Sequence, residues 1–259
     1  MTQTLSEQTA IVTGSSSGIG KAIAEELAVA GANVVTNSRS EERAEHAAAN
    51  IERAGGTAVG VAADVTDPDS VATLVDEAVD EFGRLDIMIN NAGTNVRGPA
   101  ESFDPADWQH VIDVDLSGVF FGAQAAARRM IEQGNGGHIV NISSIMGEVG
   151  LHERAAYSAA KGGVNNLTRT LSVEWAEHSI HVNALAPGYI KTEMTDEALA
   201  EVGFTDANVR NRTPLERWGS PEEMATCVRF LVEGDHFVTG EVLHADGGWL
   251  AFAWGSSGD

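Results

Sequence analysis

The feature that most constrains the fold is an alternation of short apolar runs, rich in β-branched residues, with longer stretches of helical periodicity. The short runs predict strands at Thr9–Thr13, Val34–Thr36, Ala58–Ala62, Ile87–Ile89, His138–Ile142, His181–Leu185 and Val242–His244. The longer stretches predict helices at Ile19–Ala30, Glu41–Arg53, Ser70–Phe82, Asp107–Gln133 and Ala155–Ala176. Strands separated by helices of this length form right-handed crossovers in a sheet covered on both faces. The sequence therefore predicts an α/β protein with a doubly wound, seven-stranded, mostly parallel sheet flanked by helices.

The chain shows no linker and no break in composition, so we expect residues 1–259 to form a single domain. The least regular stretch, 192–221, is polar and has few strand signals. In a doubly wound sheet, ligands bind outside the carboxyl ends of the strands. We therefore expect the irregular stretch to form a segment that covers the substrate there.

A glycine-rich turn, Thr13–Gly20, joins the first predicted strand to the first predicted helix. Glycines at such a place let the backbone turn tightly and approach a pyrophosphate, which then lies at the helix N-terminus. The spacing here is Gly-x3-Gly-x-Gly rather than the commoner Gly-x-Gly-x-x-Gly, but its position between strand and helix is that of a dinucleotide-binding Rossmann fold. The expected cofactor contacts in this turn are Gly14, Ser16, Ser17, Gly18, Ile19 and Gly20.

The end of the second predicted strand bears on which dinucleotide is bound. NAD-specific folds place an acidic residue there to bind the ribose hydroxyls. This chain reads Thr-Asn-Ser-Arg-Ser from Thr36, with no acid before Glu41. The planar cation of Arg39, beside Ser38, suits a 2′-phosphate, although Arg39 could also be a solvated residue at a helix start. The sequence thus favours NADP(H) over NAD(H), while leaving use of NAD(H) open.

Tyr157 and Lys161 stand four residues apart, on one face of a predicted helix. A phenol is a poor acid–base group at neutral pH unless a nearby cation stabilises its anion, and Lys161 is placed to do so. Ser144, after the fifth predicted strand, could donate a hydrogen bond to a substrate oxygen. A Tyr-x-x-x-Lys pair alone is common, so these residues gain weight only together with the glycine turn.

Taken together, these motifs resemble the short-chain dehydrogenase/reductase family over essentially the whole chain. The matching positions, in order, are Thr13–Gly20, Asp64-Val65, Asn90–Gly93, Ser144, Tyr157, Lys161, and Pro187-Gly188 with Thr192. The resemblance implies an oxidoreductase that moves a hydride between a nicotinamide and a carbonyl or hydroxyl carbon. It assigns the reacting oxygen to Ser144 and Tyr157, proton transfer to Tyr157, and the nicotinamide ribose to Lys161.

The resemblance also extends the expected cofactor site beyond the glycine turn. Asp64 and Val65 match positions that contact adenine, and Asn91, Ala92 and Gly93 match a wall of the cleft. The region matched to the nicotinamide amide contains Pro187, Gly188, Ile190 and Thr192.

One position departs from the family pattern. The family usually has an asparagine in its central helix, which bends the backbone and anchors a water leading from the lysine. This chain has Asp115 there. A carboxylate can accept hydrogen bonds from water and ammonium but adds a buried negative charge, so we expect Asp115 to take part in the catalytic group.

Within the family, several segments look like those of gluconate 5-dehydrogenases and the deoxy-keto-gluconate dehydrogenases, among them Ala186–Thr195 and Asp246–Leu250. Arg97 and Arg154 are candidate ligands for a substrate carboxylate, or else surface arginines in ion pairs. A sugar or sugar-acid dehydrogenase is the first hypothesis and a 3-oxoacyl-thioester reductase the second. A catalytically silent NADP-binding sensor is the third, and the intact Ser144, Tyr157 and Lys161 argue against it.

The net charge of the chain bears on which classes of partner it can bind. There are 38 acidic and 16 basic residues, a formal net charge of −22. Such a surface repels nucleic acid and anionic lipid, so we expect neither as a partner, and we identify no metal-binding motif. The acid excess and the scarcity of lysine favour a protein adapted to molar salt. With one cysteine and no apolar run long enough to span a bilayer, we expect a cytoplasmic protein, which the family resemblance suggests is a homotetramer.

Overall fold

The computed structural model describes residues 4–192, 195, 205–234 and 236–252. Within them lies a seven-stranded sheet with the strand order β3-β2-β1-β4-β5-β6-β7, in which every neighbouring pair is parallel. The strands are β1 (Thr9–Val12), β2 (Asn33–Ser38), β3 (Thr57–Ala62), β4 (Ile87–Asn90), β5 (Gly137–Ile142), β6 (Ile180–Pro187) and β7 (Val242–Ala245). The predicted doubly wound fold is confirmed, with a sheet that is parallel throughout.

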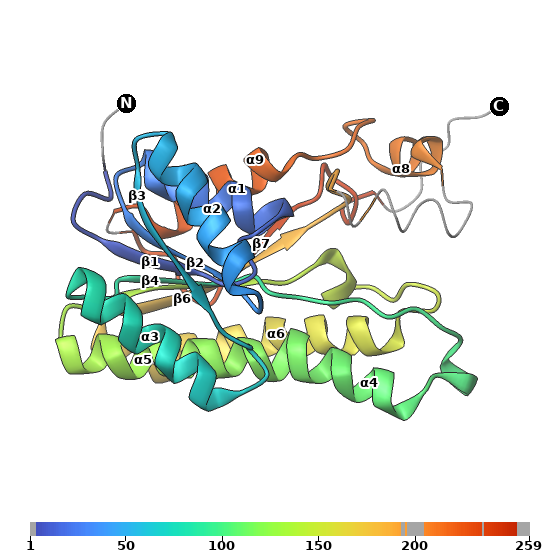
Figure 1. The fold of residues 1–259 in the computed structure, drawn as a ribbon. Helices are drawn as coiled ribbons and strands as arrows, with labels where there is room; N and C mark the ends of the chain where they lie inside the picture. Colours follow the sequence, from blue (N-terminus) through green and yellow to red (C-terminus); the bar gives the residue numbers. More distant parts are fainter. Residues whose placement is uncertain (1–3, 193–194, 196–204, 235, 253–259) are drawn as a thin grey trace.

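Helices cover both faces of this sheet (Figure 1). One face carries α1 (Gly18–Val29), α2 (Glu41–Arg53) and α9 (Pro221–Val232), and the other carries α3 (Pro68–Phe82), α5 (Gly118–Gln133) and α6 (Ala155–Glu174). The shorter elements are η1 (Ala100–Ser102), α4 (Pro105–Ile112), η3 (Ile145–Gly147), η4 (Ala176–His178) and α8 (Asp206–Arg212). Among the described residues, no helix combines the length and the apolar character that crossing a membrane requires.

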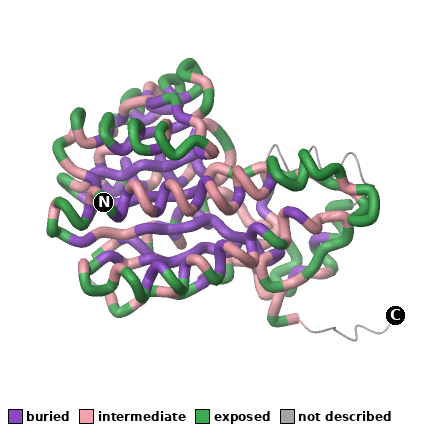
Figure 2. The backbone as a smooth tube through the Cα atoms, turned by 90° about the horizontal axis from the view of Figure 1, so that it is seen from below, coloured by how far each residue is buried: buried purple, intermediate pink, exposed green. Residues whose placement is uncertain are grey.

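The core consists of two apolar layers, one on each side of the sheet. Every residue of β1 and of β4 is buried, because helices cover both faces of these central strands. Leu27 of α1 and Leu74 of α3 are each fully buried against opposite faces. Burial of one such side chain stabilises the fold by about 1.5–3 kcal/mol. Figure 2 shows the result, with buried backbone along the strands and exposed backbone on the outer helix surfaces.

The predicted helix Asp107–Gln133 differs from the structure in its middle. It consists of α4, a π-helical turn over Asp113–Ser117, and α5. The Asp104 side chain accepts a hydrogen bond from the Ala106 backbone, and α4 begins at Pro105, two residues earlier than predicted. A π turn inserts one extra residue without stopping the helix, so the apolar pattern runs through it and does not reveal it.

The predicted substrate-covering segment, 192–221, is only partly visible. Residues 193–194 and 196–204 lie outside the described residues. The described part contains α8, whose N-terminus is closed by reciprocal hydrogen bonds between Thr205 and Asn208. The covering role of this segment stays a prediction.

Candidate active site

A cleft of about 630 Å³ lies at the carboxyl ends of β1, β2, β4, β5 and β6. All the residues predicted to bind cofactor line it, namely Gly14, Ser16, Ser17, Gly18, Ile19, Gly20, Ser38, Arg39, Asp64, Val65, Asn91, Ala92, Gly93, Tyr157, Lys161, Pro187, Gly188, Ile190 and Thr192. The other predicted catalytic residues, Asp115 and Ser144, line it too. The fold thus brings residues from positions 14 to 192 into one site.

The glycine turn has two distinct uses for glycine. Gly14 and Gly18 have φ angles of +63° and +57°, which side chains disfavour. A Cβ at Gly20 would lie 2.3 Å from Nδ2 of Asn91, so this glycine admits the loop after β4. The turn therefore needs glycine for its conformation and for packing against the protein, besides any approach to a pyrophosphate.

Three polar side chains hold this turn in place. The Asn91 amide donates to the carbonyls of Thr13 and Gly14 at 2.9 and 3.2 Å, and the Thr13 hydroxyl accepts from the backbone of Asn91 and Ala92. The Asn37 side chain accepts from the Gly14 backbone and donates to carbonyls of β3 and the residue after it. Asn37 was not among the predicted site residues. Its only sequence signal is an amide at the end of a predicted buried strand.

The end of the cleft at β2 is cationic. Arg39, just before α2, lines it as predicted, and Arg43, in the first turn of α2, lines it as well. Arg43 was missed, and its sequence signal is a second arginine in the first turn of the helix that follows Arg39. Hydrogen bonds from Thr66, together with the charges of Arg39 and His110, hold the pKa of Asp64 below its usual value against the effect of burial. No carboxylate from β2 takes part among the described residues.

The opposite end of the cleft contains a buried ion pair. The Lys161 ammonium lies 3.0 Å from Oδ1 of Asp115, and the two side chains are 4% and 0% exposed. Lys161 also donates to the Ile142 carbonyl at 3.0 Å, while Oδ2 of Asp115 accepts from the Thr94 backbone. Burial alone would lower the pKa of Lys161, but the negative charge of Asp115, aided by Tyr157, raises it above its usual value. Lys161 therefore remains a cation.

This contact refines the sequence interpretation of Asp115. The carboxylate projects from the π-helical turn, which is the bend that the family resemblance implies at this position. At 3.0 Å the carboxylate meets the ammonium directly, so no water molecule fits between Asp115 and Lys161.

Ser144 and Tyr157 lie beside the buried cation. The Ser144 oxygen accepts from the Met146 backbone at 3.1 Å, which leaves its O–H free to donate. The centroid of the Tyr157 ring lies 5.5 Å from the Lys161 ammonium, and the ring packs against the buried cluster of Val111, Ala156 and Ala160. Both hydroxyls belong to residues that line the cleft and can act as hydrogen-bond donors there, and the Lys161 ammonium can stabilise negative charge on the phenol.

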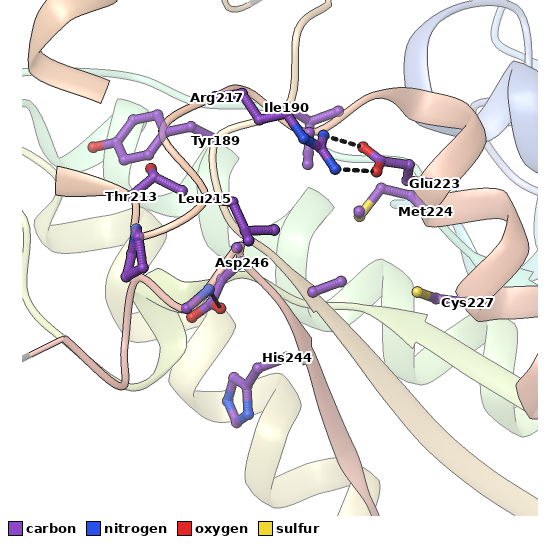
Figure 3. Close-up of a pocket in the computed structure, with 15 residues that line it drawn as sticks. Tyr189, Ile190, Thr213, Leu215, Arg217, Glu223, Met224, Cys227, His244 and Asp246 are labelled. Atoms are coloured by element: carbon purple, nitrogen blue, oxygen red, sulfur yellow. Dashed lines mark hydrogen bonds and ion pairs between the residues drawn. The ribbon is translucent and has the colours of Figure 1, made fainter. Parts of the chain in front are cut away.

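At the β6 end, the cleft adjoins a second pocket of about 480 Å³ (Figure 3). The two share Ile190, whose carbonyl accepts from the hydroxyl of Thr195 at 2.9 Å. Thr195 lines the cleft and was missed, since it lies in an irregular stretch. Tyr189 and Thr213 lie together at one end of the second pocket, away from Cys227, while Arg217 is paired with Glu223.

The two predicted substrate arginines are not among the residues that line the cleft. Arg97 pairs with Glu153. Arg154 precedes the first residue of α6 and is half-buried. The structure therefore separates two residues that the sequence treats alike.

We expect loss of the Asp115 carboxylate to destabilise the protein. Asp115→Ala leaves a buried ammonium without its counterion, which should lower the free energy of unfolding by about 3–5 kcal/mol. Asp115→Asn should cost less because its oxygen can still accept a hydrogen bond. Asp113→Ala is the matched control, since Asp113 lies in the same π turn and, within the described part of the chain, its side chain accepts an exposed hydrogen bond from Gln109. Urea unfolding of the cofactor-free protein measures the differences, and equal stability of the two alanine variants would contradict the role given to the ion pair.

The chain is similar to known oxidoreductases over nearly its whole length. A family model described as enoyl-(acyl carrier protein) reductase matches residues 14–250. The chain is 43% identical over 245 residues to gluconate 5-dehydrogenase of Gluconobacter oxydans (strain 621H), covering 94% of this chain and 95% of that protein. It is 44% identical over 253 residues to cis-4-hydroxycyclohexanecarboxylate dehydrogenase of Sinomonas cyclohexanicum, covering 97% and 100%.

A solved structure agrees with the sequence relatives. The crystal structure of a gluconate 5-dehydrogenase from Burkholderia cenocepacia J2315 in complex with NADP and tartrate superposes with a TM-score of 0.91 at 39% identity. The match covers 96% of this chain and 97% of that one. The chain therefore belongs to the short-chain dehydrogenase/reductase family, as its motifs indicate, and is an oxidoreductase.

Proposed function

We propose that this protein is an NADP(H)-dependent dehydrogenase that interconverts a secondary alcohol and a ketone on a sugar acid or a related hydroxy acid. The observation that carries the proposal is one continuous cleft that joins the N-terminus of α1 and Arg39 to Ser144, Tyr157 and Lys161. A dinucleotide site and an acid–base group are thereby held in one cleft.

The described residues fit such a cofactor. The Ser17 side chain does not cap α1, so the first backbone N–H groups of the helix lack side-chain partners and suit a pyrophosphate. A Cβ at Gly18 would meet nothing closer than 3.7 Å, which shows that the turn is open there. Arg39 and Arg43 supply donors for a 2′-phosphate, Asp64 and Val65 would contact adenine, and Lys161 would hold the nicotinamide ribose.

The chemistry follows from the chain's own groups. A bound nicotinamide supplies or accepts the hydride. Ser144 donates a hydrogen bond to the substrate oxygen, and Tyr157 gives that oxygen a proton in reduction or takes one in oxidation. The Lys161 cation stabilises the negative charge that develops on the phenol, and Asp115 keeps that cation in place.

The names of the relatives support the substrate class. Gluconate and cis-4-hydroxycyclohexanecarboxylate are both carboxylic acids with a hydroxyl on a carbon remote from the carboxylate. We carry that shared chemistry to this chain as the expected substrate.

Replacement of the acid–base group tests the reaction. We expect Tyr157→Phe to lower kcat by about 10²–10⁴-fold on the best substrate, because the phenylalanine ring cannot transfer a proton. Cofactor binding, followed by NADPH fluorescence, should be largely unchanged. The screen that identifies the substrate compares gluconate, other aldonic acids, cis-4-hydroxycyclohexanecarboxylate and acetoacetyl thioester in high salt. Turnover of the thioester alone would sink the hydroxy-acid proposal, and full activity of the variant would remove Tyr157 from the mechanism.

Cofactor preference tests the cationic end of the cleft. The wild type should show a higher kcat/KM with NADP⁺ than with NAD⁺. Arg39→Ala should lower kcat/KM for NADP⁺ by about 10–100-fold, because a charge-assisted hydrogen bond is lost, and leave that for NAD⁺ nearly unchanged. Arg53→Ala, at the other end of α2 and outside the cleft, is the control. A wild-type preference for NAD⁺ would show that Arg39 does not select the cofactor.

The acidic composition bears on the salt concentration in which the protein works. We propose a cytoplasmic homotetramer adapted to molar salt, on the net charge of −22, the single cysteine and the family membership. At about 0.01 M salt the Debye length is near 30 Å, so acidic groups repel one another across the domain, whereas at about 1 M it is near 3 Å. Folding and assembly concentrate these charges, so low salt disfavours both.

A potassium chloride series tests this salt adaptation. We expect Tm to rise by about 5–10 °C between low and molar salt, which corresponds to a few kcal/mol, and sedimentation to show tetramers at high salt. Sucrose of matched osmolality stabilises proteins by exclusion from their surface without screening charge, so the part of the rise in Tm that exceeds the rise in sucrose measures the charge effect. A Tm and a subunit count that do not change with salt would contradict the adaptation.

A further inference from the structure

The loop before α6 places two arginines in contrasting surroundings. Glu153 has a φ of +59°, a conformation that residues other than glycine seldom adopt. Its carboxylate pairs with Arg97, lies 3.7 Å from Nδ1 of His152, and its carbonyl accepts from the Gly98 backbone. The Glu153 carboxylate is therefore committed to Arg97, and the charge of Arg97 is balanced.

Arg154, the next residue, has no such partner. Among the described residues, its guanidinium makes no hydrogen bond or ion pair, and Nη1 is shielded from solvent without an acceptor. Burial, followed by repulsion from Arg97, lowers the pKa of Arg154, against which Glu153, Tyr189 and Tyr157 act. An arginine with five donors that is half-buried and unpaired costs the protein stability unless an anion binds to it.

The position of Arg154 ties it to the reacting end of the cleft. It immediately precedes α6, three residues before Tyr157, and its own backbone angles are not helical. The charge of Arg154 interacts with both Tyr157 and Tyr189. Because Tyr157 lines the cleft, Arg154 lies near the end of the cleft that holds the acid–base group.

Other cations near this place are already engaged. Arg212 lies with its guanidinium carbon 4.2 Å from the Trp249 ring centroid and donates to the Trp249 carbonyl. Arg217 is bound to both carboxylate oxygens of Glu223. Tyr189 is held by ring contacts with Trp218 and Trp249, and burial raises its pKa despite Arg154 and Arg212, so it keeps its proton. In the described part of this region, Arg154 is the cation left for an anionic ligand.

We infer that Arg154 binds the carboxylate of the hydroxy-acid substrate and sets how far from that carboxylate the hydroxyl reaches Tyr157. This inference rests on the proposed function and deepens it. Arg97 then positions the loop through Glu153 and does not contact substrate. The site selects anionic hydroxy acids over the neutral polyols that have the same hydroxyl pattern.

The test uses the best acid from the substrate screen and its neutral counterpart, in which CH₂OH replaces the carboxylate; for gluconate this is glucitol. We expect Arg154→Met to raise KM for the acid by about 10–100-fold, with little change in kcat. The kcat/KM for the neutral compound should change by less than about threefold, and Arg154→Lys should restore part of the affinity for the acid. The double variant Arg97→Gln/Glu153→Gln removes the neighbouring ion pair as a unit. It should keep the preference for the acid over the neutral compound, because Arg154 is unchanged, while loss of the pair that positions the loop lowers kcat/KM for both compounds alike.

Three results would overturn the inference. The first is an unchanged KM for the acid in Arg154→Met, and the second is an equal loss on acid and neutral compound, which would make Arg154 structural. The third is loss of acid preference in the double variant alone, which would assign the carboxylate to Arg97.

Calorimetry separates this inference from the proposed function. The acid is titrated into the wild type and Arg154→Met, each loaded with NADPH so that the acid cannot be oxidised. Binding that depends on Arg154, without turnover when NADP⁺ is supplied, would support the inference and reject the proposed function. Oxidation of the acid at the same rate in the wild type and Arg154→Met would support the proposed function and reject the inference about Arg154. Failure of every acid in the screen to bind or react would reject both.

Discussion

The buried ammonium of Lys161 is the point on which the site depends. It is contributed by α6, accepted by the last carbonyl of β5, and paired with Asp115 from the turn between α4 and α5. Asp115 in turn receives the backbone of Thr94, after β4. A charge so far from solvent is stable only when these partners are all present, so the same contacts that neutralise it also fix the relative positions of the catalytic segments.

In the glycine turn, too, the contacts that satisfy polar groups also fix the positions of segments distant in sequence. Positions 20 and 14 require glycine because Asn91 and Ala92 leave no space there for a Cβ atom. The Asn91 side-chain amide donates hydrogen bonds to the carbonyls of Thr13 and Gly14. Asn37 holds the turn from the other side and ties it to β3. This wall of the cleft is therefore held by the protein's own hydrogen bonds to neighbouring strands. Pre-organisation of this kind reduces the entropy lost on binding.

Charge is distributed unevenly over the molecule. The sequence is strongly acidic, yet the cleft gathers Arg39, Arg43 and Lys161, and Arg154 stands near its reacting end. Asp115 neutralises Lys161, so the excess positive charge lies at the β2 end, with Arg39 and Arg43, and at Arg154. Positive charge at these two places in an acidic protein attracts a phosphate-bearing cofactor and an anionic substrate. The arrangement thus agrees with both halves of the proposed reaction.

The sequence by itself determined the order of the strands and of the helices up to α6, the doubly wound sheet and the glycine turn, because hydrophobic period and motif spacing are local properties of the chain. Its motifs also identified the predicted cofactor residues of the cleft, but not α8, α9, Arg43 or Thr195. It did not determine the π turn at Asp115, since one extra residue leaves the apolar pattern intact, nor the support given by Asn37. It also could not separate Arg97 from Arg154. Which arginine receives the carboxylate of Glu153 depends on a left-handed residue and on the packing of two loops distant in sequence. Only the tertiary structure decides that, because the pairing of a charge is set by what lies around it in space.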